Sequence, residues 1–531
     1  MFKILDCTLR DGGYYTDWDF NANLVDLYLE TMSTLPVDII ELGYRSVSKD
    51  SYFGEYFYLP LKTIQKARKK LNNSQEIAVM VNSKDVASKH ELEVILRDCI
   101  GLVDMVRFAA APTNINHTMK LANAAKALGF KVALNVMYLS KLTDEELNSL
   151  SAIDDINGLD YLYLVDSYGS CYPTDISKKF NLLQDLNPNI KYGFHGHDNM
   201  ELAFANTIES INSGVSIVDS TLTGMGRGAG NLKTELISIY KSNQSNSPMM
   251  FDNLVNLVDE FNLLKQDYKW GASLPYIIAG IRGLPQNKVM QLMSKQRYST
   301  LSIIESLEDS HKNISKIKDY GEFELSGMEH KFNSVIIIGG GKELFNHINS
   351  IKEFALCNNS LIINSSVKNY EIFEKSHLKQ LVCLPGDEKN KIDIINTQSP
   401  NLLGFIFTEK TLNAVDFNEN VSKIYKIDIL SDLKNSANEI DEDAPLAMAI
   451  SAAQELGIKE IYLAGFDGYR GITSKENYLS IENQMIIDNY NSLYRENKLQ
   501  TITPSLYKVD RLSMYDLLSK PQRIDNKKVT V

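Results

Sequence analysis

The stretch Lys191-Tyr192-Gly193-Phe194-His195-Gly196-His197-Asp198-Asn199 runs from a short apolar segment directly into polar residues. The chain has eight histidines in 531 residues, and two of them stand here with one residue between them. If the stretch is a β-strand, alternate side chains share a face, so His195 and His197 point the same way. Two imidazoles on one face, with a glycine between them, suit a divalent metal ion. The alternative is a pair of histidines that end a strand and bind no metal.

The same arrangement, a short apolar segment followed by polar residues, recurs along the first half of the chain. The predicted strands are Lys3–Asp6, Ile39–Gly43, Ile77–Val81, Met105–Phe108, Lys131–Met137, Tyr161–Val165, Lys191–Phe194 and Ser216–Asp219. Segments with the periodicity of amphipathic helices lie between them. Strands that alternate with helices form a parallel sheet, and eight such units in about 240 residues are typical of a closed (β/α)₈ TIM barrel. An open doubly wound sheet is the alternative, but it rarely needs eight regular units.

Polar residues gather where the predicted strands end, which in a TIM barrel is the edge that carries the active site. They are Arg10, Asp11, Glu41, Arg107, Asn135, Asp166, Ser167, His195, His197 and Asp219. Asp11 follows the first strand, which a closed barrel places near the strands that carry the histidines. A carboxylate and two neutral imidazoles leave open positions on an octahedral cation, where a substrate can chelate. The Arg10 guanidinium beside them suits the negative oxygens of a 2-oxo acid or an enolate.

Further residues at this edge complete the predicted site. We assign substrate binding to Arg107, Asn135, Asp166 and Ser167 because they share the edge with the metal ligands. A glycine-rich loop, Gly224-Met225-Gly226-Arg227-Gly228-Ala229-Gly230-Asn231, follows the last predicted strand. Its glycines allow the backbone to approach a ligand closely. The Asn231 side chain at its end can offer a carbonyl oxygen to the metal or hold the ligand.

Composition argues against several other classes of protein. A net charge of −12 argues against nonspecific binding of nucleic acid or of anionic membranes. The five cysteines are scattered and include no CxxC pair, so neither a disulfide framework nor a thiolate zinc site is expected. The N-terminus lacks the apolar core of a signal peptide, and no run of about 18 apolar residues offers a membrane span. We therefore expect a cytoplasmic protein.

Four ordered motifs resemble the metal-dependent pyruvate aldolase and lyase superfamily of TIM barrels. They are Leu5-Asp6-Cys7-Thr8-Leu9-Arg10-Asp11-Gly12-Gly13, Val165-Asp166-Ser167-Tyr168-Gly169, His195-Gly196-His197-Asp198-Asn199 and Gly228-Ala229-Gly230-Asn231. The superfamily includes 4-hydroxy-2-oxovalerate aldolase, 3-hydroxy-3-methylglutaryl-CoA lyase, and the isopropylmalate and homocitrate synthases. The resemblance covers about residues 3 to 240 and is greatest to the 4-hydroxy-2-oxovalerate aldolase branch.

The resemblance implies a divalent-metal-dependent aldolase, a carbon–carbon lyase that acts on a 4-hydroxy-2-oxo acid through a pyruvate-type enolate. It makes Asp11, His195 and His197 the ligands of Mn²⁺ or Mg²⁺, with Asn231 as a further ligand. It also implies that Arg10 stabilises the enolate oxygen during the reaction.

Two further catalytic residues are predicted. The resemblance makes Glu41, in Ile40-Glu41-Leu42-Gly43, a carboxylate of the pocket. The aldolases carry a histidine shortly after the Arg-Asp-Gly motif as general acid/base, but here the segment reads Gly13-Tyr14-Tyr15-Thr16-Asp17-Trp18. Tyr14 or Tyr15 could replace that histidine, although a tyrosine hydroxyl needs assistance to transfer protons near neutral pH. We assign the role to Tyr14; aromatic packing at the barrel mouth is the alternative for either residue.

Two other functions stay open at this point. A Claisen-type acyl-CoA condensing transferase could use the same barrel, and a degenerate barrel without catalysis could serve as a binding scaffold. The missing histidine favours the scaffold, whereas the intact metal and arginine residues oppose it. The expected partners are a small-molecule 2-oxo acid and an aldehyde, and we expect a homo-oligomer. In the resembled aldolases a helical extension contacts an aldehyde dehydrogenase, but no feature of this sequence supports that partner.

The second half of the chain is richer in Asn, Lys and Ile and lacks further barrel motifs. We predict a barrel domain at 1–242, a short helical extension and connector at 243–328, and a Rossmann-like α/β domain at 329–531. Gly339-Gly340-Gly341 follows an apolar strand and could cradle a phosphate. Residues 460–469 resemble a segment of Rossmann-like domains in bacterial surface-polysaccharide enzymes. That resemblance implies a role in the synthesis of a surface sugar.

Overall fold

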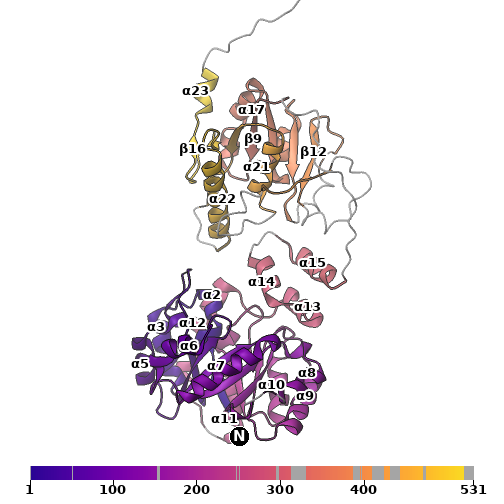
Figure 1. Ribbon diagram of the computed structural model, residues 1–531. Coiled ribbons are helices and arrows are strands. Elements are labelled where there is room, and N and C mark those ends of the chain that lie inside the picture. The colour runs from indigo at the N-terminus through magenta and orange to yellow at the C-terminus, as the bar shows by residue number, and fades with distance from the viewer. Residues whose placement is uncertain are drawn as a thin grey trace, which may run out of the picture. The chain divides into compact units, whose positions relative to one another are not determined.

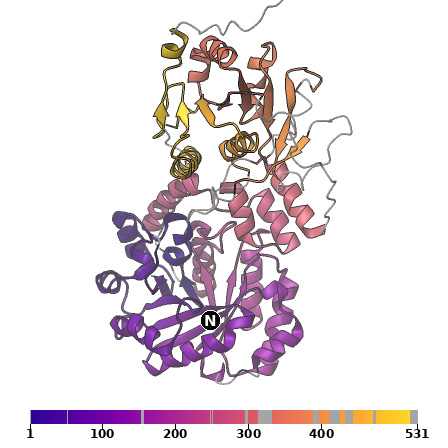
Figure 2. The ribbon, with the colours of Figure 1, turned by 45° about the horizontal axis from the view of Figure 1, so that its top comes forward.

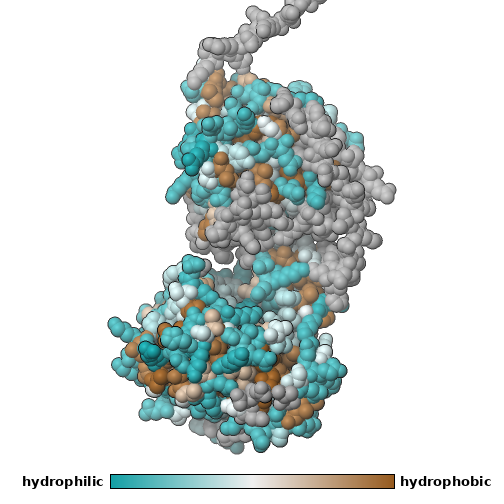
Figure 3. All heavy atoms as spheres, in the orientation of Figure 1, coloured by the Kyte–Doolittle hydropathy of each residue, from teal (hydrophilic) through white to brown (hydrophobic). Residues whose placement is uncertain are grey.

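The computed structural model of the protein describes residues 2–50, 52–151, 153, 156–246, 248–249, 251–294, 298–312, 331–386, 395, 397–408, 424–430, 443–469 and 474–519. The chain divides into two compact units, Met1–Gln291 and Leu292–Val531 (Figure 1). Hydrophilic residues cover much of the described surface on the face drawn in Figure 3, with smaller apolar areas between them. In the part of the chain that the structure describes, no helix is long and apolar enough to cross a membrane.

The first unit is a closed barrel of eight parallel strands that follow one another in chain order (Figure 2). The strands are β1 (Lys3–Asp6), β2 (Ile39–Tyr44), β3 (Glu76–Asn82), β4 (Met105–Ala110), β5 (Lys131–Val136), β6 (Tyr161–Asp166), β7 (Tyr192–Gly196) and β8 (Ile217–Ser220). The barrel closes where β1 pairs with β8, with Lys3 opposite Ile217 and Asp6 opposite Ser220. The predicted (β/α)₈ TIM barrel is thus confirmed.

Helices alternate with the strands and cover the outside of the barrel. Those of the first unit are α1 (Thr8–Asp11), α2 (Gly13–Thr16), α3 (Ala22–Met32), α4 (Glu55–Tyr58), α5 (Leu61–Lys70), α6 (Lys89–Leu96), α7 (Ile115–Ala127), α8 (Asp144–Ser151), α9 (Pro173–Leu186), α10 (Ala203–Asn212), α11 (Thr234–Ser245), α12 (Asp252–Tyr268) and α13 (Leu274–Arg282), and α14 (Gln286–Ser294) begins in it. Helix α3 shows why they form: the Asn21 side chain caps two backbone N–H groups of its first turn. Its buried residues Val25, Tyr28, Leu29 and Met32 recur at helical spacing on one face.

The predicted boundary at residue 242 does not separate two compact units. Helix α12 belongs to the first unit because its buried residues Leu254, Leu257 and Phe261 join the core that surrounds the barrel. The Phe261 and Tyr28 rings, for example, lie 6.5 Å apart between centroids. Residues 313–330, which include the end of the predicted extension and connector, lie outside the described residues.

The side chains inside the barrel are apolar in one layer and ionisable at the ends of the strands. Small and apolar side chains together with two tyrosines fill one interior layer: Leu5, Cys7, Ile39, Ala78, Met105, Ala133, Tyr161, Tyr163 and Ile217. Ionisable side chains occupy the ends of the strands beyond this layer, and they are equally buried. The exposed fraction is at most 2% for each of Glu41, Arg107 and Asp219. Charges buried this deeply must be paired, because an isolated ion in a protein interior is very costly.

The second unit is an open parallel sheet, which agrees with the prediction of a second α/β domain. The strand order is β13-β12-β11-β10-β9-β14-β15-β16. The strands are β9 (Ser334–Ile338), β10 (Ser360–Asn364), β11 (Gln380–Cys383), β12 (Leu402–Phe407), β13 (Ile424–Lys426), β14 (Glu460–Ala464), β15 (Gln500–Thr501) and β16 (Asp510–Arg511). The order reverses between β9 and β14, as in doubly wound sheets.

Helices pack on both faces of this second sheet. The described helices of four or more residues are α15 (Thr300–Lys312), α16 (Glu343–Asn346), α17 (Ile348–Cys357), α18 (Tyr370–Glu374), α21 (Pro445–Glu455), α22 (Ser474–Leu493) and α23 (Met514–Ser519). Alternate residues of β9 face opposite cores: Val335 and Ile337 join one, Ile336 and Ile338 the other.

The predicted phosphate cradle after β9 already holds a carboxylate. The Asp467 Oδ2 atom accepts a hydrogen bond from the Glu343 N–H at 2.9 Å. A Cβ atom added at Gly341 would lie 2.3 Å from the Asp467 carboxylate. The glycines therefore make room for Asp467, and the negative charge of that side chain opposes a phosphate at the same place.

Candidate active site

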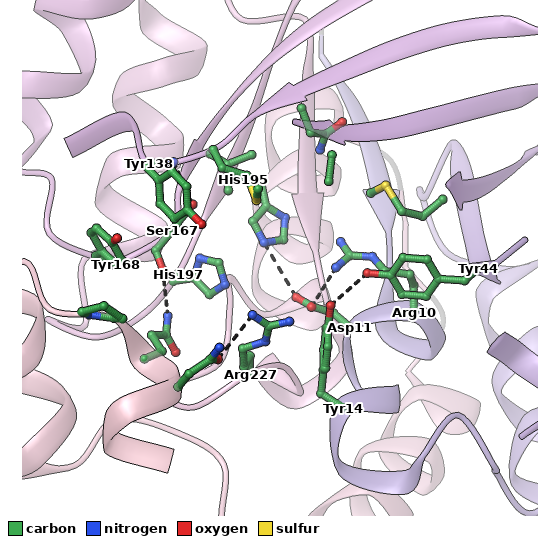
Figure 4. A pocket seen from close by; sticks show the side chains of 18 residues that line it. Arg10, Asp11, Tyr14, Tyr44, Tyr138, Ser167, Tyr168, His195, His197 and Arg227 are labelled. Atoms are coloured by element: carbon green, nitrogen blue, oxygen red, sulfur yellow. Dashed lines mark hydrogen bonds and ion pairs between the residues drawn. The ribbon is translucent and has the colours of Figure 1, made fainter. Parts of the chain in front are cut away.

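Asp11, His195 and His197 meet at the C-terminal edge of the barrel (Figure 4). Asp11 ends the single turn α1 that follows β1, while His195 lies in β7 and His197 follows it directly. One ligand atom from each side chain lies within 4.8 Å of the others, a spacing that fits one metal ion. His195 Nε2 is 3.7 Å from Asp11 Oδ2, and the two imidazole centroids are 5.0 Å apart. The predicted grouping of these three residues is therefore present.

Both imidazoles are oriented by hydrogen bonds from their Nδ1 atoms. His195 Nδ1 lies 2.9 Å from Asp219 Oδ2, and His197 Nδ1 lies 2.9 Å from the Asp166 carbonyl oxygen. A carbonyl oxygen only accepts, so His197 Nδ1 carries the proton and Nε2 keeps its lone pair. Burial, and then the neighbouring His195, lower the pKa of His197 to about 3. A neutral imidazole with a free Nε2 is the form that binds a metal.

The Asn231 side chain supplies an independent test of whether the residues fit a cation. Its Nδ2 donates to Asp11 Oδ2 at 2.5 Å, and a β-bridge joins its backbone to His197. Its Oδ1 atom is buried and has no hydrogen-bond partner among the described residues. A buried carbonyl oxygen without a partner is costly, and a bound cation would satisfy it. The donor set of one carboxylate, two imidazoles and one amide oxygen therefore fits a divalent ion.

A chain of buried ion pairs extends from Arg10 behind the histidine. Arg10 Nε donates to Glu41 Oε2 at 2.7 Å, and Arg107 Nη1 donates to Glu41 Oε1 at 3.1 Å. Arg107 Nη2 then donates to Asp219 Oδ2 at 2.5 Å, and Asp219 holds His195. Because each charge touches an opposite one, the network fixes the orientations of Arg10 and His195 at the same time.

The charge of Asp11 is held by the same network. Arg10 Nη1 donates to Asp11 Oδ1 at 2.8 Å. Burial by itself would raise the pKa of Asp11, but Arg10, and then His195, outweigh it and hold the pKa well below its ordinary range. Asp11 is therefore a carboxylate over the whole neutral range, as a metal ligand must be.

Three predicted site residues are buried behind the pocket rather than in it. Arg107 and Glu41 are fully buried and do not line the cavity. Asp166 is also fully buried, and its two oxygens accept the Ser170 and Cys171 N–H groups at 3.0 Å each. The sequence did not predict this depth, because position at a strand end does not reveal whether a side chain turns into the cavity or into the network below it.

The cavity at this edge has a volume of about 250 Å³. Seven of the predicted residues line it: Arg10, Asp11, Tyr14, Asn135, Ser167, His195 and His197. Sequence reasoning missed the others, which are Tyr44, Met80, Ala109, Met137, Tyr138, Val165, Tyr168, Arg227, Pro285, Gln286 and Asn287. Arg227 had a visible signal, since it is the one charged side chain in the glycine-rich loop. Gln286 and Asn287 had none, because they arrive from a helix beyond the barrel.

Tyr14 and Tyr15 lie side by side in the chain but have different roles. The Tyr14 hydroxyl lies in the cavity wall, 3.0 Å from the Tyr44 hydroxyl, as Figure 4 shows. The Tyr15 hydroxyl donates to the Gly228 carbonyl oxygen at 3.3 Å, and Tyr15 does not line the cavity. Of the two tyrosines, Tyr14 is therefore the one placed to meet a substrate.

Comparison with known proteins agrees with this geometry. The model of the family described as HMGL-like matches residues 1–259. A 4-hydroxy-2-oxovalerate aldolase of Geobacillus genomosp. 3 is 28% identical over 44% of this chain and 68% of its own length. An oxaloacetate decarboxylase of Mycobacterium tuberculosis is 23% identical over 58% of this chain and 91% of its own.

Among solved structures, the N-terminal domain of a putative aldolase from Bacteroides vulgatus is similar in both sequence and fold. It is 41% identical, superposes with a TM-score of 0.53, and is matched over 57% of this chain and 100% of its own length. The residues matched by the family model include the barrel and the cluster of Asp11, His195 and His197. Through this barrel the chain belongs to the HMGL-like family.

Proposed function

We propose that the barrel is a divalent-metal-dependent aldolase that cleaves the C3–C4 bond of a 4-hydroxy-2-oxo acid, yielding a pyruvate-type enolate and an aldehyde. The observation that carries the proposal is the cluster of Asp11, His195 and His197 beside Arg10, with Asn231, whose buried Oδ1 has no partner among the described residues, bound to Asp11. The similarity to 4-hydroxy-2-oxovalerate aldolases supports the same reaction.

The proposed metal ion is Mn²⁺ or Mg²⁺, held by Asp11, His195 and His197 with the amide oxygen of Asn231. When bound, such an ion polarises the 2-oxo group of a substrate as a Lewis acid. The protein provides the neutral imidazole of His197 and the ionised carboxylate of Asp11 that this binding needs.

Arg10 is the residue proposed to stabilise negative charge on the enolate oxygen. Its Nε and Nη1 atoms are engaged by Glu41 and Asp11. Its Nη2 atom makes no hydrogen bond or ion pair with the rest of the described chain, and the side chain lines the cavity. A guanidinium already held by two carboxylates needs little reorganisation when charge develops on the substrate.

Proton transfer is assigned to Tyr14. In the cleavage direction its oxygen, once deprotonated, accepts the proton of the substrate's C4 hydroxyl while the C3–C4 bond breaks. Burial, and then the neighbouring Tyr14, raise the pKa of Tyr44 well above its ordinary range, so Tyr44 keeps its proton and can donate it to a deprotonated Tyr14 oxygen, 3.0 Å away. The Arg227 guanidinium lies 3.8 Å over the Tyr14 ring and also favours negative charge there.

Asn135 and Ser167 keep their proposed role in substrate binding. Both line the cavity, and the buried Asn135 Oδ1 has no partner among the described residues, which leaves it to accept a hydrogen bond from a ligand. Ser167 Oγ accepts the Tyr138 N–H at 2.9 Å, so its own hydrogen is directed elsewhere and can meet a carboxylate oxygen.

The test is pyruvate release from 4-hydroxy-2-oxopentanoate, assayed with Mn²⁺, with Mg²⁺ and with a chelator. We expect release that requires the metal. Thiol release from acetyl-CoA in the presence of a 2-oxo acid would instead support the condensing transferase. Purified protein that binds neither metal would support the scaffold and overturn the proposal.

We also propose that the reaction serves the synthesis of a surface sugar. The support is the similarity of residues 460–469 to surface-polysaccharide enzymes, a segment that includes β14 and the loop after it, at the strand where the sheet order reverses. Titration of the full-length protein with nucleotide-linked sugars tests this role. If none of these sugars binds, the proposed role in surface-sugar synthesis is rejected.

A further inference from the structure

The cavity contains a second guanidinium, that of Arg227, whose charge is paired by no carboxylate of the described residues. Arg227 is half-buried, and its Cζ lies 3.8 Å from the Tyr14 ring centroid. Its Nη1 lies 3.4 Å from Asn287 Oδ1, a neutral oxygen (Figure 4). Within the described residues no carboxylate lies within ion-pair distance of it. Arg10, in contrast, contacts both Asp11 and Glu41.

The loop that carries Arg227 is held on both sides. A Cβ atom at Gly226 would lie 2.2 Å from Asn231 Nδ2, and one at Gly228 would lie 2.3 Å from Gln286 Oε1. Gly228 also has a φ of +63°, in the region that favours glycine. The loop is therefore packed tightly between Asn231 and Gln286. The backbone position of Arg227 is therefore fixed, and the packed loop directs its side chain onto Tyr14.

Burial and position indicate which end of a substrate Arg227 would meet. Arg10 is 7% exposed and lies at the bottom of the cavity, whereas Arg227 contacts the exposed residue Asn287. Arg227 also stacks on Tyr14, the residue assigned to the C4 hydroxyl. A 2-oxo acid with its oxo group near Arg10 and Asp11 would thus direct the part beyond C4 toward Arg227.

We propose that Arg227 binds a second anionic group, a carboxylate or a phosphate, on the part of the substrate that becomes the aldehyde. This substrate class rests on the proposed aldolase function. A partly buried guanidinium without a carboxylate partner is a binding site for such a group, because its planar donors match carboxylate and phosphate oxygens. In the reaction, the C4 hydroxyl proton goes to the Tyr14 oxygen and the C3–C4 electron pair goes to the enolate. The aldehyde that leaves retains the anionic group.

Equilibrium binding tests the subsite independently of catalysis. 2-Oxoglutarate and 2-oxopentanoate have the same chain length, lack the hydroxyl needed for cleavage, and differ in one terminal carboxylate. By calorimetry with Mn²⁺ present, we expect 2-oxoglutarate to bind at least about 10-fold more tightly, as expected of a charge-assisted hydrogen bond. Arg227→Met should abolish this preference, and Arg227→Lys should restore part of it.

The matched control is Lys233→Met, which removes one positive charge from the exposed side of the same segment. It should leave the preference for 2-oxoglutarate unchanged. Equal binding of the two acids by the native protein, or a preference that survives Arg227→Met, would overturn the subsite whatever the enzyme catalyses. A preference that depends on Arg227, in a protein that releases no pyruvate from any 4-hydroxy-2-oxo acid, would instead reject the aldolase function and leave the anion subsite standing.

Cleavage rates then distinguish the two sources of the anion. The probes are 4-hydroxy-2-oxo acids that carry a methyl, a carboxylate or a phosphorylated hydroxymethyl group at C4. We expect kcat/KM to be highest for one of the two anionic probes. The ratio of this kcat/KM to that of the methyl probe should fall about 30-fold or more in Arg227→Met. A ratio that stays constant while all three rates fall together would mean that Arg227 supports the site without binding the anion.

Discussion

Arg107 donates from Nη2 to Asp219 Oδ2 at 2.5 Å, and the Arg107 side chain has no solvent-exposed surface. The same Asp219 oxygen lies 2.9 Å from His195 Nδ1, so one carboxylate oxygen connects a buried guanidinium to the candidate metal site. Arg107 also lies over the Tyr163 ring, with Cζ 4.4 Å from its centroid. The candidate site therefore depends on a buried electrostatic support that no substrate reaches.

Removal of one partner from this support should destabilise the protein. Asp219→Asn leaves Arg107 with Glu41 alone, and breaking a buried pair in this way costs about 3–5 kcal/mol. Urea unfolding of the metal-free protein measures the loss. The control is Lys126→Met, which breaks the exposed Lys126–Asp160 pair at 2.9 Å and should cost about 1 kcal/mol or less. Equal losses in the two variants would contradict the structural role of Asp219.

The effect of Asp219 should also depend on pH. Burial by itself would raise the pKa of Asp219, but the Arg107 guanidinium outweighs it and lowers the pKa below its ordinary value of 3.8. A group with a lowered pKa in the folded protein stabilises the fold above its ordinary pKa and loses that contribution as the pH falls. The stability difference between native protein and Asp219→Asn should thus be full at pH 7 and shrink below about pH 3.8.

The candidate metal ligands predict a difference between two histidine variants. His195→Ala should reduce Mn²⁺ affinity by about 100-fold or more, since it removes a ligand and unpairs Asp219. His117→Ala provides the control, because His117 Nε2 contacts the Val86 carbonyl oxygen and His117 lies outside the cluster. Calorimetric titration of the two metal-free variants and the native protein with Mn²⁺ gives the affinities. Unchanged Mn²⁺ binding by His195→Ala would refute the ligand assignment.

Neighbouring tyrosines offer a matched test of proton transfer. Tyr14→Phe should lower kcat for 4-hydroxy-2-oxo acid cleavage by about 100-fold or more, because general acid–base groups contribute that much. Tyr15→Phe should change kcat only a few-fold, because its hydroxyl donates to the Gly228 carbonyl oxygen outside the cavity. Similar kcat values for Tyr14→Phe and the native enzyme would leave Tyr14 with a packing role alone.

Cysteine reactivity is predicted from burial. Cys7, Cys99, Cys171 and Cys383 are buried, while Cys357 is exposed. Burial raises the pKa of Cys99 to about 11 and raises the pKa values of Cys7 and Cys171 as well, so these thiols stay protonated and unreactive. An aromatic disulfide reagent at pH 8 should modify one thiol quickly in the native protein and all five after unfolding. Rapid modification of more than one native thiol would contradict this burial.

Sequence spacing was sufficient to predict the barrel and the candidate metal-ligand cluster. Each strand is short and apolar and ends in polar residues, and closure of eight parallel strands brings their ends to one edge. Asp11 and His195 are far apart in the chain, yet β1 and β7 both pair with β8 and so lie near each other. Alternation along β7 then directs His195 and His197 to the same side.

Spacing did not reveal how deep each polar side chain lies. Glu41, Arg107 and Asp166 satisfy the same rule as Arg10, but they turn below the cavity into ion pairs and backbone hydrogen bonds. Whether a strand-end residue faces a ligand or a buried partner depends on which charges other strands bring beside it. That information is spread over several strands and is absent from any one of them.

The sequence by itself determined the eight-stranded barrel, the open second sheet and the candidate metal-ligand cluster, because short stretches of sequence contain the periodicity and the strand ends. Only the tertiary structure decided the buried Glu41–Arg107–Asp219 support and the position of Arg227 over Tyr14. It also brought Gln286 to the cavity from a helix beyond the barrel. Such contacts arise from packing between distant segments. Whether a buried charge has a partner, and therefore its free energy, depends on which of those segments pack beside it.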